Sequence, residues 1–277
     1  MGKTIIVDSG CDIPDLMKKE LSVTVVPLSM MLGQAEFADD ESLDLPEFLE
    51  AMKACKEKVG SASPPPYLYQ EAIQETGSEY VITLSGKLSG SYSNAVLGNN
   101  LAREETGHSA HIFDSKSASA GETLIAIKLH ELLREGLPKA RIIEIIHEFI
   151  ENMKTYFVLE NYDNLLKNGR LGKVAGNLIQ ILNIKLIMGS DGDGNIALYE
   201  KVRGVRRMIG QLMSLIETSG KNTEDGNLVI SHCNNLELAE QLLAEIKKRF
   251  HFQNIHIVPS GGLSSLYTDD KGVVIAF

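Results

Sequence analysis

The stretch that decides the fold is Thr4-Ile5-Ile6-Val7-Asp8-Ser9-Gly10-Cys11-Asp12-Ile13-Pro14-Asp15. Residues 4–7 are mostly β-branched, which predicts a short buried strand, and residues 8–12 form a polar loop at its carboxyl end. Asp12 followed by Pro14 is typical of a helix start, so we expect Asp12 to be the N-cap of a helix. The stretch is therefore a strand, a loop and a helix, the first unit of an α/β sheet.

The same alternation continues outward from this stretch through the first half of the chain. We expect further strands at residues 23–28, 80–84 and 111–113, and helices at residues 45–58, 67–75, 94–105, 121–135 and 140–153. Residues 60–66, which contain three prolines, are expected to form a rigid loop. Strands that alternate with helices predict a mainly parallel sheet with helices on both faces.

The pattern changes near Lys154. The second half predicts helices at residues 161–167, 206–218 and 236–250, and strands at residues 186–188, 196–202, 227–232, 255–258 and 273–277. Residues 189–195 are expected to form a hairpin turn. We therefore predict an α/β protein of two domains, an N-terminal domain at residues 1–155 with the parallel sheet and a C-terminal α+β domain at residues 156–277.

Composition and charge exclude several classes of protein. The chain has 277 residues, of which 43% are hydrophobic and 23% charged, and this predicts a globular protein with a sizeable core. A nucleic-acid-binding protein needs a basic surface to neutralise phosphates, whereas the formal net charge here is -10. We therefore expect no nucleic acid among the partners.

The spacing of the cysteines and the length of the apolar runs indicate the cellular compartment of the protein. Cys11, Cys55 and Cys233 lie far apart and show no metal-ligand spacing, so free thiols in a reducing cytoplasm fit them best. Asp8 interrupts the first apolar run after three residues, which argues against a signal peptide. No run of about 18 apolar residues predicts a membrane span. We expect a cytoplasmic protein that holds no metal.

Small hydroxyl residues and glycines gather where expected strands and helices meet loops: Asp8-Ser9-Gly10, Ser61-Ala62-Ser63, Ser89-Gly90-Ser91 and Ser115-Lys116-Ser117. Ligands of open α/β sheets bind at the carboxyl ends of the strands. Hydroxyl groups and free backbone N–H groups at helix starts make an anion site there. The alternative is that these residues only form turns and caps, and the sequence leaves both open.

Three other patterns resemble known sites but lack required residues. Ser89, His111 and Asp114 include the residue types of a hydrolase triad, but no G-x-S-x-G elbow surrounds Ser89, so we expect His111 to be structural. Residues 191–195 resemble the start of a calcium loop, but Ile196 stands where glycine belongs. Residues 168–173 are glycine-rich and basic, without the spacing of a phosphate-binding P-loop.

Two groups of cations remain as candidates for anion or partner binding. Arg170 offers a planar fork of donors that suits a carboxylate or a phosphate, and its alternative role is a surface salt bridge. The run Lys201-Val202-Arg203-Gly204-Val205-Arg206-Arg207 places four cations in seven residues of an acidic chain. This run is either a docking patch for an acidic partner or a solvated helix start.

Several motifs together resemble the DegV family. Residues 5–14 look like its D-S-x-C-D-[IL]-P strand end, and residues 84–95 resemble its S-x-x-L-S-G-[ST]-Y-x-[SN]-A element. Residues 114–119 resemble its D-S-[KR] loop, and residues 165–172 its L-x-K-x-G-R-[IL]-[GS] motif. Residues 182–185 and 201–204 match two further blocks. The matches follow the family order from residue 5 to about residue 207.

The resemblance implies two α/β domains with one long-chain fatty acid buried in the cleft between them. It implies a lipid carrier without catalytic residues or a cofactor, which presents the fatty-acid carboxylate to the catalytic subunit of a fatty acid kinase for acyl-phosphate formation. Transient membrane contact is compatible with this role. Matched by motif, the ligand-binding residues are Ser61 in the T-S-x-P-like loop, Ser89 with Gly90 and Ser91, and Arg170 near the pocket mouth.

The chain departs from the family pattern near its end. The family usually carries a histidine and a G-P-G turn there, whereas this chain has Tyr267 and the acidic pair Asp269-Asp270. Tyr267 can still donate one hydrogen bond, so we include it among the ligand-binding residues. Two carboxylates near the head group would repel a phosphate. The departure therefore argues against binding of an acyl-phosphate and against partnership with a kinase.

Elementary energetics agree with a lipid carrier. Each buried methylene of an alkyl chain gains about 0.8 kcal/mol, so the tail drives binding and the head group fixes orientation. Helices from Gly121 and Asn177 carry Ile, Leu and Met that could line a tail slot. Two other functions compete: a small-molecule enzyme related to dihydroxyacetone kinases, for which no nucleotide-binding fingerprint is found, and a lipid-sensing regulatory module that docks through the basic run.

Overall fold

A computed structural model describes residues 4–172, 174, 184–224 and 226–277. The strand expected at residues 4–7 is β1 (Ile5–Asp8), and it lies inside a four-stranded sheet with the order β2-β1-β6-β7. It pairs with β2 (Val23–Val26) and β6 (Tyr80–Thr83), β6 pairs in turn with β7 (His111–Asp114), and all three pairings are parallel. The prediction of a parallel sheet in the first half is therefore confirmed.

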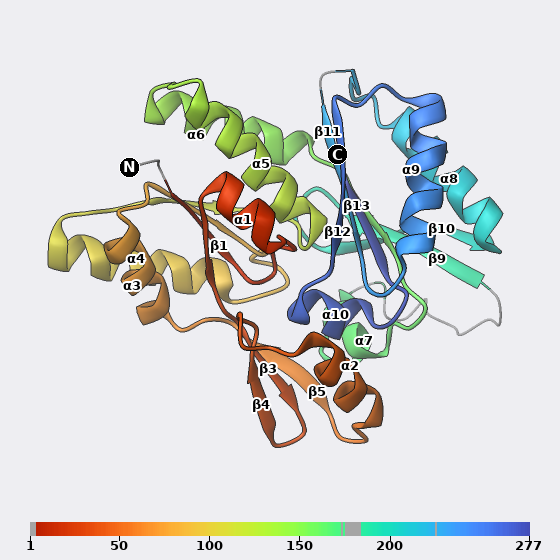
Figure 1. The fold of residues 1–277 in the computed structure, drawn as a ribbon, viewed down its shortest axis with the longest axis horizontal. Coiled ribbons are helices and arrows are strands. Elements are labelled where there is room, and N and C mark those ends of the chain that lie inside the picture. Colours follow the sequence, from red (N-terminus) through yellow and green to blue (C-terminus); the bar gives the residue numbers. More distant parts are fainter. Residues whose placement is uncertain (1–3, 173, 175–183, 225) are drawn as a thin grey trace.

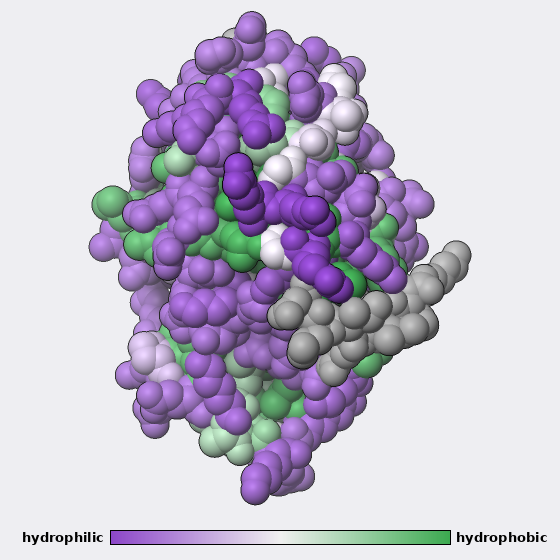
Figure 2. Space-filling view, turned by 90° about the vertical axis from the view of Figure 1, so that its right-hand side faces the viewer, coloured by the Kyte–Doolittle hydropathy of each residue, from purple (hydrophilic) through white to green (hydrophobic). Residues whose placement is uncertain are grey.

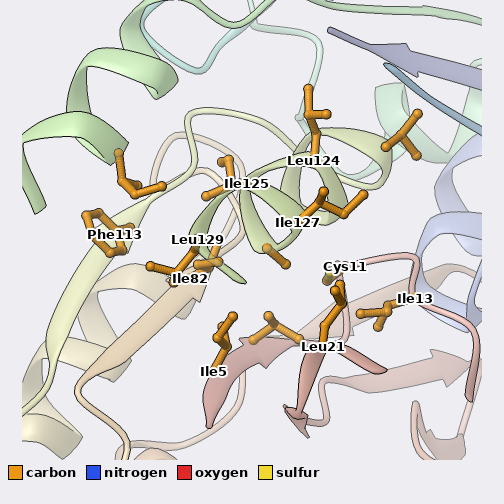
Figure 3. Close-up of a cluster of buried hydrophobic side chains, with 14 of the residues drawn as sticks. Ile5, Cys11, Ile13, Leu21, Ile82, Phe113, Leu124, Ile125, Ile127 and Leu129 are labelled. Carbon is orange, nitrogen blue, oxygen red and sulfur yellow. The ribbon is translucent and has the colours of Figure 1, made fainter. Parts of the chain in front are cut away.

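Helices cover both faces of this sheet, because successive side chains of a strand point to opposite faces. Ile5 and Val7 pack against α5 (Ala120–Arg134), with α1 (Asp15–Leu21) and α6 (Lys139–Asn152) in the same core cluster. Ile6 packs on the other face, against α3 (Pro66–Thr76) and α4 (Ser91–Thr106). Figure 3 shows Ile5, Ile82 and Phe113 of the strands facing Leu124, Ile125 and Leu129 of α5.

The second half forms a six-stranded mixed sheet with the order β10-β9-β8-β13-β11-β12. Its strands are β8 (Thr155–Val158), β9 (Ile184–Ser190), β10 (Ile196–Arg203), β11 (Asn227–His232), β12 (Asn254–Pro259) and β13 (Val273–Ala276). One face packs on α8 (Val205–Thr218) and α9 (Leu236–Arg249). The other face packs on α5, which thus lies between the two large sheets (Figure 1).

A third sheet was missed by the sequence analysis. It is antiparallel, with the order β4-β3-β5, and consists of β3 (Ser29–Leu32), β4 (Ala35–Ala38) and β5 (Val59–Ala62). Two helices pack beside it, α2 (Leu45–Ala54) and α10 (Gly262–Thr268). This group lies below the two large sheets in Figure 1, next to α7 (Asp163–Lys167). We call β3, β4 and β5 the small sheet.

Several local predictions were wrong. Residues 59–62 are a strand rather than part of a loop, and the helix expected at residues 45–58 already ends at Ala54. Asp12 is not an N-cap, because α1 begins at Asp15 with Pro14 before it, and the Asp12 side chain is buried. Helix α10 and strand β8 were not foreseen. The hairpin at residues 189–195 is confirmed, and Asp191 accepts hydrogen bonds from the N–H groups of Asp193 and Asn195.

The fold agrees with the predicted α/β class. We retain the division into residues 1–155 and 156–277 as a proposal; Thr155 is the first residue of β8. Lys173, the start of the expected helix at Asn177, and Leu182 and Asn183 of the fifth motif lie outside the described residues.

Candidate functional site

An internal cavity of about 360 Å³ lies where the three sheets meet. Its wall takes residues from the first half of the chain, among them Gly10, Ser61 and Ser89, and from the second half, among them Arg170 and Tyr267. Ligand cavities in proteins are commonly about 300–1,000 Å³ and mostly apolar. The cavity therefore has the size of a small-molecule site, and both halves of the chain enclose it.

Most of the wall is apolar. Side chains from several elements contribute to it: Leu84, Leu88, Phe157, Leu159, Leu165 and Val274. We expected the helix that starts at Gly121 to line a tail slot, but among the described residues no part of α5 lines the cavity. α5 instead fills the space between the two large sheets, and its apolar side chains are buried in the core there. Strands β8 and β13 supply apolar wall in its place.

Ser61 and Tyr267 meet at the cavity wall. The Ser61 Oγ and the Tyr267 hydroxyl are 2.8 Å apart and form a hydrogen bond in which either group can donate. Ser61 is carried by β5 and Tyr267 by α10, and both side chains are half-buried. Two hydroxyl groups, 206 positions apart in the chain, thus offer donors to the same part of the cavity.

The three residues of the Ser89-Gly90-Ser91 motif do not all line the cavity. Ser89 and Gly90 line the cavity, whereas Ser91, the first residue of α4, is fully buried outside it. Ser91 donates its backbone N–H to the Ser89 Oγ at 3.2 Å, and the two hydroxyl oxygens are 3.0 Å apart. A Cβ on Gly90 would come within 2.9 Å of the Ser63 Oγ, so glycine allows the loop to pass there. Ser91 supports Ser89 rather than facing the cavity.

Arg170 lines the cavity beside this loop. Its Nε donates a hydrogen bond to the Leu88 carbonyl oxygen at 3.0 Å, and its Nη1 donates to the Asn168 carbonyl oxygen. In the described part of the chain, no carboxylate forms an ion pair with Arg170. The alternative of a surface salt bridge is therefore not seen among the described residues, and the charge of Arg170 is held at the cavity wall by two backbone carbonyl oxygens.

The acidic pair after Tyr267 is turned away from the cavity. Asp269 accepts a hydrogen bond from the Asn161 amide at 2.9 Å, and Asp270 pairs with Lys53 at 3.3 Å and with the Asn234 amide at 3.1 Å. Neither is among the cavity-lining residues. These partners hold both carboxylates just after the end of α10, so the expectation that they lie near a head group stays a prediction, to which the cavity wall lends no support.

Two buried acidic side chains, Asp8 and Glu122, lie side by side near the loops behind the cavity. Asp8 accepts hydrogen bonds from the N–H groups of Gly10 at 3.0 Å and Leu84 at 2.9 Å. Glu122 is fully buried next to it, and among the described residues no donor reaches either of its oxygens. Burial and the nearby Asp8 charge raise the pKa of Glu122 well above its ordinary value, which favours the neutral form of its carboxyl group. A neutral Glu122 avoids the energetic penalty of a second buried charge.

Asp39, which follows β4, joins the small sheet to α10. Its two carboxylate oxygens accept hydrogen bonds from the N–H groups of Gly262 and Leu263, each at 3.0 Å. Burial raises the pKa of Asp39 from 3.8 to about 6, although these hydrogen bonds oppose the rise and the Asp12 charge adds to it. The ionised form of Asp39 is therefore disfavoured in the folded protein relative to the unfolded chain.

This pKa predicts a pH dependence of stability. The unfolded chain releases the Asp39 proton near pH 4 and the folded protein near pH 6, so the stabilisation is complete below pH 4 and is lost as pH rises through 6. The free energy of unfolding of the wild type minus that of Asp39→Asn is expected to fall by about 2–3 kcal/mol from pH 4 to pH 7. Urea unfolding of both proteins across this range measures it, and a difference that rises with pH would contradict the assignment.

The residues of the possible hydrolase triad and of the basic run do not form a second site with the cavity residues. The His111 Nε2 is 3.0 Å from the His147 Nε2, and Asp114 accepts hydrogen bonds from the N–H groups of Gly86 and Lys116, so Ser89, His111 and Asp114 make no mutual bonds. The residues of the basic run from Lys201 to Arg207 are exposed except Val202, which is half-buried. They belong to β10 and α8, on the side of the molecule where hydrophilic residues cover most of the face in Figure 2.

Some cavity residues were not named as ligand-binding candidates from the sequence. Lys116 and Ser117 line the wall; their loop was one of the four for which the sequence left an anion site or a simple turn open, but neither was named as a ligand-binding residue. Thr155, Ser190 and Asn195 also line it, and no local sequence signal distinguishes them. Within the described ranges, no group of three or more His, Cys, Asp or Glu side chains could hold a metal. No helix in the described part of the chain has the length and apolarity needed to cross a bilayer.

Comparisons with known proteins agree on one family. The family model described as "Uncharacterised protein, DegV family COG1307" matches residues 3–277. A DegV domain-containing protein of Streptococcus pneumoniae is 33% identical over 276 residues, which cover 99% of this chain and 98% of the relative. A similar protein of Streptococcus pyogenes serotype M1 is 32% identical over the same length and coverage.

Solved structures with the same fold hold fatty acids. A DegV family protein of Ruminococcus gnavus, refined with vaccenic acid, is 37% identical and superposes with a TM-score of 0.95, with 100% of both chains covered. The Streptococcus pneumoniae Fatty Acid Kinase (Fak) B3 protein, loaded with linoleic acid, is 32% identical with a TM-score of 0.88 over 100% of this chain and 99% of that one. A Eubacterium eligens DegV family protein loaded with heptadecanoic acid is 25% identical, with a TM-score of 0.90 over 99% and 98%.

Proposed function

This chain belongs to the DegV family, and on that premise we propose that it binds one long-chain fatty acid in the internal cavity and presents the carboxylate to a fatty acid kinase. The observation that carries the proposal is the cavity itself, which is mostly apolar and has hydroxyl groups from both halves of the chain at one part of its wall. This arrangement suits a molecule with a long apolar tail and one polar end.

The apolar wall accounts for affinity. Each methylene that leaves water gains about 0.8 kcal/mol, so an alkyl chain along Phe157, Leu159 and Leu165 is the main source of binding energy. The tail needs no polar partner, whereas a buried carboxylate does. The tail thus holds the ligand, and the polar end decides which way round it lies.

The polar part of the wall supplies donors for a carboxylate. We assign the head group to Ser61, Tyr267 and Ser89, with Gly90 beside them. Ser61 and Tyr267 share one hydrogen bond with each other, so one of the two protons is free to turn to a ligand oxygen. Arg170 has no carboxylate partner in the described part of the chain and adds a positive charge at the same wall. We propose that Ser91 acts through Ser89, because its own hydroxyl is buried outside the cavity.

A fatty acid kinase is the partner that we propose, because a similar chain is the Fatty Acid Kinase (Fak) B3 protein of Streptococcus pneumoniae. In this role the chain is a carrier and the kinase performs the phosphoryl transfer, so no residue of this chain is proposed as catalytic. Arg170 would meet the new phosphate as a bidentate donor. Three free cysteines support a place in the reducing cytoplasm, and transient membrane contact would allow lipid exchange.

Mass spectrometry is the direct test of lipid binding. We expect native spectra of the purified protein to show one bound fatty acid per chain, and organic extracts to identify it. An empty protein that also fails to take up added fatty acids would overturn the proposal. Incubation of the loaded protein with a fatty acid kinase catalytic subunit and ATP, followed by hydroxylamine trapping of acyl-phosphate, tests the kinase partnership separately.

Ser89→Ala tests the head-group assignment. Loss of the hydroxyl leaves a buried carboxylate short of one donor, so fatty-acid binding is expected to weaken by about 1–3 kcal/mol. A fluorescence displacement titration measures the change. Ser93→Ala is the matched control, because Ser93 is exposed on α4 two residues beyond Ser91. Equal affinities of Ser89→Ala and the wild type would remove Ser89 from the head-group site.

A further inference from the structure

Helix α10 is held at both ends by the segment of chain that forms the small sheet. At its start, the Asp39 carboxylate accepts the N–H groups of Gly262 and Leu263, each at 3.0 Å. Near its end, the Tyr267 hydroxyl lies 2.8 Å from the Ser61 Oγ of β5. Between these two points the helix packs on β3, β5 and α2. One short helix therefore connects a buried carboxylate to the hydroxyl pair in the cavity wall.

The start of α10 sits closely against its support. A Cβ on Gly262 would come within 2.4 Å of the Asp39 Oδ1, 2.5 Å of the Leu43 Cδ2 and 2.7 Å of the Met30 Cε. No side chain fits there, so glycine is needed for the helix to approach Asp39. Asp39 itself is only 8% exposed. The position of the first turn is thus fixed by direct contact and by two charge-assisted hydrogen bonds.

A displacement of this first turn would reach Tyr267. The helix rises about 1.5 Å per residue, so Tyr267 lies only about 7.5 Å along the axis from Gly262. A segment of one and a half turns moves as a unit, because its backbone hydrogen bonds resist internal bending. The hydrogen bond between Tyr267 and Ser61 tolerates a shift of only a few tenths of an ångström before it weakens.

We infer that Asp39 is a positioning residue for the head-group site, which it reaches through α10 by fixing where Tyr267 meets Ser61. The inference rests on the proposed function, since it concerns the same site. Asp12 holds the preceding residue, Gly261, but Asp12 also bonds Ser119 and Ser231 in the core. The Asp39 carboxylate directs both of its full hydrogen bonds to α10, with the Ser9 hydroxyl nearby. Substitution of Asp39 therefore acts on α10 and also removes a hydrogen bond with the Ser9 side chain, and the Tyr267→Phe background separates the two effects.

A double-mutant cycle separates positioning from general destabilisation. Oleate affinity is measured at neutral pH by fluorescence displacement for the wild type, Asp39→Asn, Tyr267→Phe and the double variant. We expect Asp39→Asn alone to weaken oleate binding about tenfold, and to weaken it less than about twofold when Tyr267 is already phenylalanine. Asp40→Asn is the control, because Asp40 is exposed and, among the described residues, its side chain accepts hydrogen bonds only from Ser42; its oleate affinity should equal that of the wild type.

Each outcome decides the inference. Equal weakening by Asp39→Asn in both backgrounds would show that Asp39 does not act through Tyr267, and unchanged affinity would show that it does not act on the site. If Asp39→Asn does not fold, Asp39→Glu replaces it in the cycle, because it keeps the charge and changes only the reach; additive effects of Asp39→Glu overturn the inference in the same way. A wild type that does not bind oleate would instead remove the proposed function.

Discussion

Ala118→Phe is expected to remove most fatty-acid binding while leaving the fold intact. Ala118 is half-buried in the cavity wall beside Leu84 and Leu263. A phenyl ring at this position would occupy space that the alkyl tail needs. Displacement of about four methylenes, at about 0.8 kcal/mol each, weakens binding by about 3 kcal/mol, which is on the order of a hundredfold. The effect lies at the upper end of the range expected for Ser89→Ala, because the tail supplies most of the binding energy.

The measurement compares lipid binding with stability. Displacement titrations with oleate give the affinity, and mass spectrometry of the purified variant shows whether lipid still accompanies it. Thermal unfolding should give a melting temperature equal to or above that of the empty wild type, since the ring fills a void. Ala140→Phe is the control, because Ala140 is exposed on α6. Retention of full affinity by Ala118→Phe would show that the tail does not lie along this wall.

The large sheets could be predicted because their strands carry strong local signals. Residues 5–7, 23–26 and 80–83 are rich in β-branched and aromatic residues, and the structure places each of them in a buried or half-buried strand. The amphipathic period of α6 and α9 was equally clear. In these segments local preference and tertiary packing agree, which is the condition under which sequence patterns succeed.

The small sheet and α10 could not be found in this way. Ala35–Ala38 is mostly exposed and carries no alternation of apolar and polar residues. Gly262–Thr268 contains glycine, two serines and a threonine, all of which are buried. Its position is set by contacts with Asp39 and Met30, more than 200 residues earlier in the chain. Such long-range contacts leave no local period in the sequence.

The candidate site was predicted only in part. The strand-end argument and the family resemblance placed Ser61, Ser89, Arg170 and Tyr267 in one region, and the structure brings all four to the same cavity. The sequence could not show that Ser89 lines the cavity and Ser91 does not, because both are serines of the same motif and differ only in the direction that the backbone gives their side chains. The polar cavity residues Thr155, Ser190 and Asn195 carry no local signal, so only the fold shows that they line the cavity.

Asp12 illustrates how a correct local pattern can have another cause. The run Asp12-Ile13-Pro14-Asp15 looks like a capped helix start, and a helix does begin at Asp15. The Asp12 side chain, however, is 1% exposed and accepts hydrogen bonds from the Ser119 and Ser231 hydroxyls and from the Gly261 N–H. These donors come from the start of α5, from β11 and from the loop before α10. Asp12 therefore ties three distant segments together behind the cavity.

The two roles of Asp12 predict different losses of stability. A helix N-cap contributes about 1 kcal/mol. A buried carboxylate that accepts from three donors contributes more, because its removal leaves the Ser119 hydroxyl and the Gly261 N–H without this partner, at about 1–3 kcal/mol each, whereas the Ser231 hydroxyl keeps Ser260. We expect Asp12→Ala to lower the free energy of unfolding by about 3–5 kcal/mol, which is a large part of the stability of an ordinary domain. Urea unfolding followed by circular dichroism gives the value.

Asp15→Ala is the matched control, because Asp15 is exposed in the first turn of α1 and, within the described part of the chain, its side chain pairs only with Lys18. Surface pairs of this kind contribute about 0–1 kcal/mol, so the control should stay close to the wild type. Asp12→Asn keeps one acceptor oxygen and should fall between the two. A loss of about 1 kcal/mol or less in Asp12→Ala would return Asp12 to the role of a cap. A loss several times larger would mean that the loops behind the cavity depend on the Asp12 carboxylate. The same hydrogen bonds would then stabilise the fold and hold the cavity wall in place.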